Sequence, residues 1–411
     1  MRFRAFGVFL VSTMALAGAA IQERLIPPVP GAVALALQTG DRKSMNSAPR
    51  GDTRHSQRPH EAPEGPWPQF QADPQRTGQS RAKAAAGRER WVLRDISFQG
   101  ITASPVIGPD HTVYIGTDNG QLFAVNGTTG AVRWVFRRPN GVFHASAVVS
   151  RRQVFAAHDD VLYALDAKTG RENWNFKVHS YINGEPVFSP DGTLYLGDHT
   201  NHFYALDAAT GRARWEWDAP DRNFSDSTPA MGPDGTVYVG SSVPKLYALN
   251  GATGALKWTA NTDGDVYTVA VDRQNRVLVG CDHGMVHCLD GATGDERWHL
   301  QLGVEVLAHL AIGPGGVVYL GADGKLYALE SSTGKQKWVV NIADPVGSAV
   351  AIAADGLLYV GGADGYFYAL DSRTGATEWR FRADTVIISS PAIDGDGAVY
   401  FASMKSLYAV E

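Results

Sequence analysis

Cysteine is nearly absent from this chain of 411 residues, which contains only Cys281 and Cys288. If the chain turns at His283-Gly284, Cys281 lies opposite Val286, and the Cα atoms of the two cysteines are about 8 Å apart, beyond the ~7 Å limit for a disulfide. We therefore expect two buried free thiols that fill positions for small residues. The Cys-x-x-Cys-His pattern of covalently attached haem is missing as well.

Charge of either sign is also scarce. Charged residues make up 19% of the chain, and the formal net charge is -5. A protein that binds nucleic acid needs a basic surface to neutralise phosphates, and the sequence has neither a basic excess nor a long basic run. A G-x-S-x-G elbow and a phosphate-binding glycine loop are missing too. These absences exclude nucleic acid as a partner and remove two common enzyme motifs.

Long apolar runs are limited to residues 5–20, which follow the basic start Met-Arg-Phe-Arg and include the small residues Ala17-Gly-Ala19. This order is typical of a secretory signal peptide with its cleavage site. The run is too short for a membrane-spanning helix, which needs about 20 residues. We therefore expect a signal peptide over residues 1–20 and an exported, soluble mature protein, periplasmic or extracellular, with no stable membrane anchor.

What the chain does contain is a repeat of the form A-x-(D/N/E)-x-x-T-G-x-x-x-W. Full copies run over residues 124–134, 164–174, 205–215, 248–258, 328–338 and 369–379, and residues 288–298 differ only by a cysteine in place of the alanine. Trp91 and Trp379 are seven repeats apart, which gives a period of about 41 residues. A period of this length predicts one closed array rather than two or three separate domains.

Each repeat is expected to hold four short strands separated by turns. In the fourth repeat we expect the strands at residues 227–232, 236–240, 245–250 and 255–259. Glycines such as Gly235 and Gly254 supply the positive φ that the turns need. Four-stranded sheets of this kind bury their faces only by stacking radially, and the half-repeats at residues 88–93 and 406–411 would join in one blade. The sequence thus predicts an all-β, monomeric, eight-bladed β-propeller of antiparallel blades, closed by N- and C-terminal strands.

Two segments precede the repeats. Residues 21–66 are rich in Pro, Gly, Ser, Arg and Gln, a composition that predicts a disordered spacer. Order is expected to resume at Trp67-Pro-Gln-Phe70, so the propeller domain spans residues 67–411 and begins with a lead-in segment at residues 67–87. We expect this lead-in segment to pack on the outside of the propeller or to cap its base.

The tryptophan repeat, the Pro-Asp-Gly turns and the Trp67-Pro-Gln-Phe70 motif resemble those of the eight-bladed quinoprotein-type propellers. This group holds dehydrogenases that depend on pyrroloquinoline quinone (PQQ) and the BamB-like outer-membrane assembly proteins. The resemblance covers residues 67–411, whereas the sequence pairs typical of WD-repeat propellers are missing. It implies that one tryptophan per blade docks onto the neighbouring blade near its alanine and glycine. The tryptophans concerned are Trp91, Trp134, Trp174, Trp215, Trp258, Trp298, Trp338 and Trp379.

The resemblance also bears on a cofactor. The dehydrogenases carry adjacent paired cysteines over the quinone and a tryptophan beneath it, and this sequence has neither. Its remaining tryptophans are Trp67 in the lead-in segment and Trp217 on a docking strand. We therefore predict no cofactor and no catalytic residue. PQQ with Ca²⁺ is the alternative, in which Asp226, Glu305 or Asp344 would bind calcium or act as a base.

Two predicted hairpins combine aspartate with histidine, namely Asp198-His199 with His202, and Asp282-His283 with His287. Each offers two kinds of metal ligand. Both residue types are also ordinary in turns, the two hairpins belong to non-adjacent blades, and the sequence indicates no third ligand. Residues 394–397 begin like a calcium loop but lack its distal glutamate. We therefore predict no metal site.

The two faces of the predicted ring differ in the uniformity of their turns. Turns after the first and third strands repeat Pro-Asp-Gly and Thr-Gly and form a uniform face. Hairpins after the second strand and the connections between blades form a variable face, with aromatics entering blades 1 to 5 and acids entering blades 5 to 8. Folding alone does not require such variation, so the variable face is the candidate site. The candidate partner-binding residues are Phe98, Phe143, His144, Tyr181, Phe224, Asp226, Tyr267, Asp265, Glu305, His309, Asp344 and Asp384.

These observations favour a non-catalytic binding scaffold for a polypeptide, with a glycan as the alternative partner. Aromatic side chains supply much of the affinity at protein interfaces, and charges around them set orientation. Three alternatives stay open. The aromatics could merely plug the centre of the ring, the chain could be a small PQQ-dependent dehydrogenase, or it could be a carbohydrate-acting or lyase-type propeller enzyme.

Overall fold

The computed structural model describes residues 62–182, 184–220, 224, 227–303, 306, 309–342 and 348–411. The predicted signal peptide and most of the predicted spacer lie outside these residues, as do Asp226, Glu305 and Asp344. The description below concerns the unit formed by Pro59–Glu411. Within its described residues no helix is long and apolar enough to cross a membrane.

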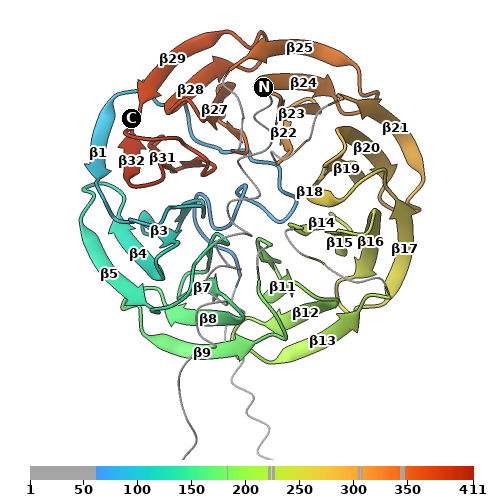
Figure 1. Cartoon of the computed structure of the whole chain (residues 1–411), viewed down its shortest axis with the longest axis horizontal. Coiled ribbons are helices and arrows are strands. Elements are labelled where there is room, and N and C mark those ends of the chain that lie inside the picture. The colour runs from blue at the N-terminus through green and yellow to red at the C-terminus, as the bar shows by residue number, and fades with distance from the viewer. Residues whose placement is uncertain are drawn as a thin grey trace, which may run out of the picture. The chain divides into compact units, whose positions relative to one another are not determined.

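The described residues form eight antiparallel sheets of four strands each, arranged as a ring of blades (Figure 1). Blade 1 contains β2 (Val106–Ile107), β3 (Thr112–Thr117), β4 (Gln121–Asn126) and β5 (Val132–Arg137), and blade 2 contains β6 (Val148–Val149), β7 (Gln153–His158), β8 (Val161–Asp166) and β9 (Glu172–Lys177). Blade 3 contains β10 (Val187–Phe188), β11 (Thr193–Gly197), β12 (His202–Asp207) and β13 (Ala213–Asp218), and blade 4 contains β14 (Ala230–Met231), β15 (Thr236–Ser241), β16 (Lys245–Asn250) and β17 (Leu256–Asn261). Blade 5 contains β18 (Val266–Val271), β19 (Arg276–Cys281), β20 (Met285–Asp290) and β21 (Glu296–Gln301), and blade 6 contains β22 (Ala311–Gly313), β23 (Val317–Ala322), β24 (Lys325–Glu330) and β25 (Gln336–Asn341). Blade 7 contains β26 (Ala351–Ile352), β27 (Leu357–Gly361), β28 (Tyr366–Asp371) and β29 (Thr377–Arg382), and blade 8 contains β30 (Ala392–Ile393), β31 (Val399–Ala402), β32 (Leu407–Val410) and β1 (Glu89–Leu93).

Blade 8 confirms the predicted closure, because its outer strand comes from the start of the propeller and its other strands from the end. Strand β1 pairs with β32 in antiparallel register, with Trp91 opposite Ala409 and Leu93 opposite Leu407. Reciprocal backbone hydrogen bonds between Arg88 and Glu411 extend this ladder, at 3.0 and 2.8 Å. The ring thereby has no open sheet edge at its seam.

Tryptophans on the outer strands join each blade to the next. The Trp215 indole N–H donates to Gly251 O at 2.8 Å, and its ring covers Gly254, which has φ +73°. A Cβ at Gly254 would lie 2.8 Å from the indole, so glycine provides both the turn and the docking space. All eight repeat tryptophans donate to a backbone carbonyl in the same way.

The lead-in segment lies inside the ring, which corrects the expectation that it could pack on the outside. Its residues accept backbone N–H bonds from the inner strands of blades 1 to 7 in turn, at or next to the strand end beside the uniform face. The N–H donors are those of Ile107, Val149, Phe188, Met231, Val271, Ile312 and Ile352. Figure 1 shows this blue segment crossing the middle of the ring. It therefore closes the centre of the ring from the uniform-face end.

Candidate functional site

The variable face carries two strongly exposed aromatic side chains. Phe98, in the connection from β1 to β2, is 83% exposed, and Tyr181, in the connection from β9 to β10, is 58% exposed. Tyr267 on β18 is half-buried. These three residues are the predicted aromatic anchors whose rings reach solvent.

Phe143 and Phe224 correct the prediction that they offer binding surfaces, because they are only 0% and 2% exposed. Each fills the space over a glycine near the end of a second strand. A Cβ at Gly116 would lie 2.6 Å from the Cβ of Phe143, and one at Gly197 would lie 3.1 Å from the Cβ of Phe224. The Phe143 ring also packs edge-on against His158, with ring centroids 4.8 Å apart. Both phenylalanines are therefore part of the packing between strands and blade connections.

The same position is occupied by aliphatic side chains in other blades. Val266 lies over Gly240, Val306 over Gly280 and Ile387 over Gly361. These side chains are 0–2% exposed. At the passage from one blade to the next, such an apolar residue thus packs against a glycine on the second strand of the preceding blade; Phe143, Phe224, Val266, Val306 and Ile387 are called wedge residues below. The glycine is the sequence signal that separates a buried residue of this kind from an exposed one.

Two of the predicted polar residues of the variable face, His144 and Asp384, are held by neighbours on the same rim. His144 Nδ1 lies 3.0 Å from Thr102 Oγ1. Asp384 accepts hydrogen bonds from Ser403 and Ser406, so it supports the hairpin between β31 and β32. Burial alone would raise the pKa of Asp384, but these hydrogen bonds lower it.

Asp265 is placed differently, next to a second carboxylate. Its backbone N–H donates to Asp282 Oδ1 at 2.9 Å. Burial and then the charge of Asp282 raise the pKa of the Asp265 carboxyl. The structure therefore brings two acids together on the rim between blades 4 and 5.

A buried arginine of the lead-in segment was not anticipated from the sequence. Arg76 is 0% exposed. Its guanidinium donates to the carbonyls of Phe70 at 2.7 Å, Pro186 at 2.9 Å, Glu185 at 3.0 Å and Pro229 at 3.1 Å. Burial lowers the pKa of Arg76 to about 10, and nearby Glu185 and Asp73 oppose this shift. Arg76 thus fastens the lead-in segment to the entrances of blades 3 and 4.

Glu185 and His309 adjoin this arginine from two different blades. The Glu185 carboxylate accepts the Ser146 hydroxyl at 3.0 Å. Burial raises the pKa of Glu185 to about 7, although Arg76 and Ser146 act in the opposite direction. His309 packs edge-on against Phe70, with centroids 4.6 Å apart. Burial and the charge of Arg76 lower the pKa of His309 to about 3.

Glu185 and His309 replace the hydroxyl residue that blades 1, 2, 4, 5 and 8 carry at the entrance to the inner strand, where blade 7 has Ala349. Ser104 and Ser390 hold this position in blades 1 and 8, where the Ser390 N–H donates to Ser104 Oγ at 2.9 Å. The Ser104 N–H in turn donates to Ser146 Oγ of blade 2 at 2.9 Å. The departure from this pattern of hydroxyl residues is the sequence signal for the cluster that Glu185 and His309 form with Arg76.

The side chains that the resemblance associates with a quinone site do not fit one here. Cys281 and Cys288 are buried free thiols on two different strands, as expected. The observed register differs from the predicted one, because Gly280 rather than Cys281 lies opposite Val286. Burial raises the pKa of each thiol to about 12. The two indoles outside the repeat are used in packing as well. Trp67 is buried, and Trp217 packs against Phe224 and Tyr247.

Comparison with known sequences places the whole ring in one family. The sequence profile of the family described as outer membrane protein assembly factor BamB matches residues 76–223, 204–279, 267–345 and 338–411. The chain belongs to this BamB family. A shorter match is to the serine/threonine-protein kinase AfsK of Streptomyces griseus, 28% identical over 123 residues. That match covers 28% of this chain and only 15% of the kinase.

Solved structures with the same architecture include both an assembly factor and an enzyme. BamB from Moraxella catarrhalis superposes with a TM-score of 0.62 at 18% identity, over 78% of this chain and 98% of that one. The quinohemoprotein alcohol dehydrogenase from Comamonas testosteroni superposes with a TM-score of 0.71 at 16% identity, over 84% of this chain and 80% of that one. At such identities these likenesses show the fold, which this BamB-family member shares with both.

Proposed function

We propose that this BamB-family propeller is an exported, non-catalytic scaffold that binds a polypeptide partner at its variable face. The observation that carries the proposal is the exposure of Phe98 within an apolar patch at the junction of blades 8 and 1. The family description supports a polypeptide partner, because it names an assembly factor for outer membrane proteins. The signal-peptide pattern at residues 5–20 supports export.

The apolar patch consists of Phe98, Val386 and Met404. Gly100, with φ +137°, brings the Phe98 loop so close to Met404 that an added Cβ would lie 2.9 Å from Met404 Cε. The Met404 N–H donates to Val386 O at 3.2 Å, and Val386 is itself 38% exposed. The loop that carries Phe98 therefore lies beside the Met404 and Val386 segments, which come much later in the chain.

Exposure of a phenylalanine to this extent has no benefit for folding. Burying such a ring is worth about 1.5–3 kcal/mol, and wedge residues such as Phe143 gain that energy within the fold. Phe98 would gain it only from a partner. A contiguous exposed apolar surface on a soluble protein is typical of an interaction site. Since aromatic side chains dominate the affinity of protein interfaces, a polypeptide with apolar side chains fits this patch.

Capture from the exporting cell tests the proposal. Proximity labelling with the wild-type chain should identify a polypeptide partner, and Phe98→Ala or Tyr181→Ala should each weaken its binding by about 1–3 kcal/mol. Val339→Ala is the matched control, because Val339 is 38% exposed but lies on the outer strand β25. An unchanged partner list for a folded Phe98→Ala/Tyr181→Ala double variant would refute the proposal. A response to glycans alone on a glycan array would favour the alternative partner.

A further inference from the structure

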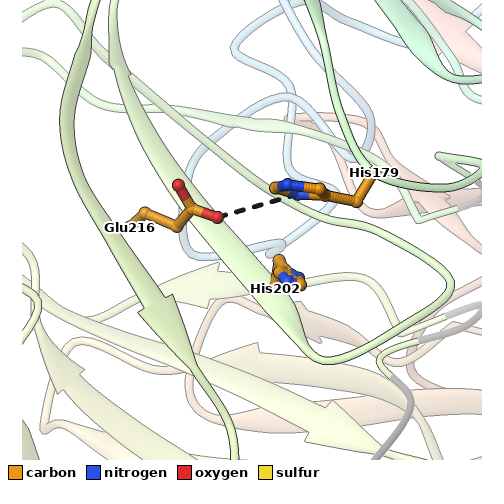
Figure 2. A group of neighbouring side chains, drawn as sticks. All are labelled: His179, His202 and Glu216. Carbon is orange, nitrogen blue, oxygen red and sulfur yellow. Dashed lines mark ion pairs between the residues drawn. The ribbon is translucent and has the colours of Figure 1, made fainter.

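We propose that His179, His202 and Glu216 form a binding site for a divalent transition-metal ion, best suited to Zn²⁺, between blades 2 and 3. One ligand atom from each residue lies within 4.8 Å of those of the other two. Figure 2 shows the Glu216 carboxylate directed at the His179 imidazole, with the His202 imidazole next to them. Two imidazoles and a carboxylate are a common set of protein ligands for Zn²⁺ that leaves a fourth position open. The proposal does not rest on polypeptide binding.

Strand pairing explains why these residues meet. His202 begins β12 and lies opposite Asp218 of β13, while Glu216 lies opposite Tyr204. Because side chains alternate between the two faces of a sheet along each strand, the side chains of these four residues lie on one face of blade 3. This face packs toward blade 2, as shown by the contact between Tyr204 and Phe176 of β9, with centroids 5.5 Å apart. His179 follows β9 in the connection to blade 3, so the chain itself delivers the third ligand.

The side chains can close around an ion with small movements. Zn–N and Zn–O bonds of about 2.0–2.2 Å place the ligands of a tetrahedral site about 3.3 Å apart. Glu216 Oε1 already lies 3.7 Å from Nδ1 on the His179 ring, and these two side chains are 41% and 61% exposed. The His179 and His202 rings are stacked with centroids 4.2 Å apart. Because the His179 and Glu216 side chains are exposed, they can rotate to bring His179 Nε2 and the carboxylate around one ion beside His202.

The surroundings of both imidazoles favour a metal. His202 Nδ1 is buried and has no hydrogen-bond partner among the described residues. His179 Nδ1 lies 2.6 Å from the Tyr204 hydroxyl, and that hydroxyl donates to Asp198 Oδ2 at 3.1 Å. The hydroxyl can thus accept a hydrogen bond from His179 Nδ1–H, which leaves His179 Nε2 as the unprotonated ring nitrogen for a metal. Outer contacts of this kind orient metal-binding histidines.

Blade 5 provides a contrast with the same residue types. His287 Nδ1 lies 2.7 Å from one Glu296 oxygen, and His299 Nδ1 lies 3.0 Å from the other. The carboxylate therefore separates the two imidazoles, whose centroids are 6.4 Å apart. His299 follows its docking tryptophan as Glu216 does, so His299→Ala is a matched control at the equivalent strand position.

Calorimetric titration of the EDTA-treated, desalted full chain with ZnSO₄ tests the site. We expect one ion per chain, a higher Tm with zinc, and affinity at least about tenfold weaker in His202→Ala and in Glu216→Gln. Glu216→Gln keeps the size of a half-exposed side chain, so it separates loss of a ligand from loss of folding. His299→Ala should bind zinc as the wild type does. Absence of stoichiometric binding, wild-type affinity in both ligand variants, or an equal loss in His299→Ala would overturn the proposal.

Discussion

Phe98 and Phe143 are the same residue type on the same face of the ring, yet they are 83% and 0% exposed. The difference comes from Gly116, whose missing side chain leaves the space that Phe143 fills. Phe136 and His158 complete that pocket of aromatic contacts, with ring centroids 6.3 and 4.8 Å from Phe143. A ring in the wedge position stabilises the fold, whereas a ring outside it is free to contact a partner.

Substitution to alanine should separate these two roles. Phe143→Ala removes a fully buried ring and leaves a cavity, so it should lower the free energy of unfolding by about 3–5 kcal/mol. Phe98→Ala removes an exposed ring and should change that free energy by no more than about 0.5 kcal/mol. Urea denaturation followed by tryptophan fluorescence measures both values. Equal destabilisation by the two substitutions would show that the wedge assignment is wrong.

At the scale of elements, the lead-in segment stabilises the ring from within. Arg76 ties it to Glu185 and Pro186 at the entrance of blade 3 and to Pro229 at the entrance of blade 4. Glu185 faces Arg76 from the lead-in segment and Ser146 from blade 2. Its carboxyl group is therefore the titratable link between the segment and two neighbouring blades.

This arrangement predicts a pH dependence of stability. The pKa of Glu185 is raised from 4.5 to about 7 in the folded chain, chiefly by burial. A raised pKa contributes stability that is fully present below pH 4.5 and is lost as the pH rises through about 7. Between pH 5 and 8 the free energy of unfolding of the wild type should therefore fall by an amount on the order of 2–3 kcal/mol that comes from Glu185. Glu185→Gln should not show this fall. Thermal and urea unfolding across this range would contradict the assignment if the two chains showed parallel pH profiles.

The elements themselves were largely predictable from the repeat. In blade 4 the third strand occupies the predicted residues 245–250, and the second extends one residue beyond the prediction to Ser241. The inner strand was predicted at residues 227–232 but pairs only over Ala230–Met231. Thr228, before this strand, bridges instead to Thr268, and the Met231 N–H within it donates to Pro74 O. Contacts at the centre of the ring are long-range, so no local pattern could indicate them.

The candidate site shows the same limit. Comparison of the turns predicted which face of the ring varies, and the position of each aromatic residue within its repeat predicted that it lies on that face. Burial of Phe143 and Phe224 depends on glycines of neighbouring strands, and the proximity of His179 to His202 and Glu216 depends on how blades 2 and 3 pack. The candidate metal ligands in the sequence each came from a single hairpin, so His202 was grouped with Asp198 and not with His179, which follows the last strand of the preceding blade.

At the scale of the whole molecule, the two faces of the ring differ in what they leave accessible. The uniform face carries the repeated turns, and the lead-in segment bonds to the inner strands beside it. The variable face carries Phe98, Tyr181 and the apolar patch. This asymmetry suits a scaffold that is closed on one side and binds on the other, which is the central claim for this BamB-family chain.

Site-specific photo-crosslinking in the exporting cell tests that claim most directly. A photoreactive benzoyl-phenylalanine at position 98 should yield a covalent adduct with a polypeptide, because Phe98 is 83% exposed on the variable face. The same group at position 339, on the outer strand β25, should yield none above background. A polypeptide adduct at 98 and none at 339 is the predicted result. No adduct at 98, or equal adducts at both positions, would contradict polypeptide binding at the variable face.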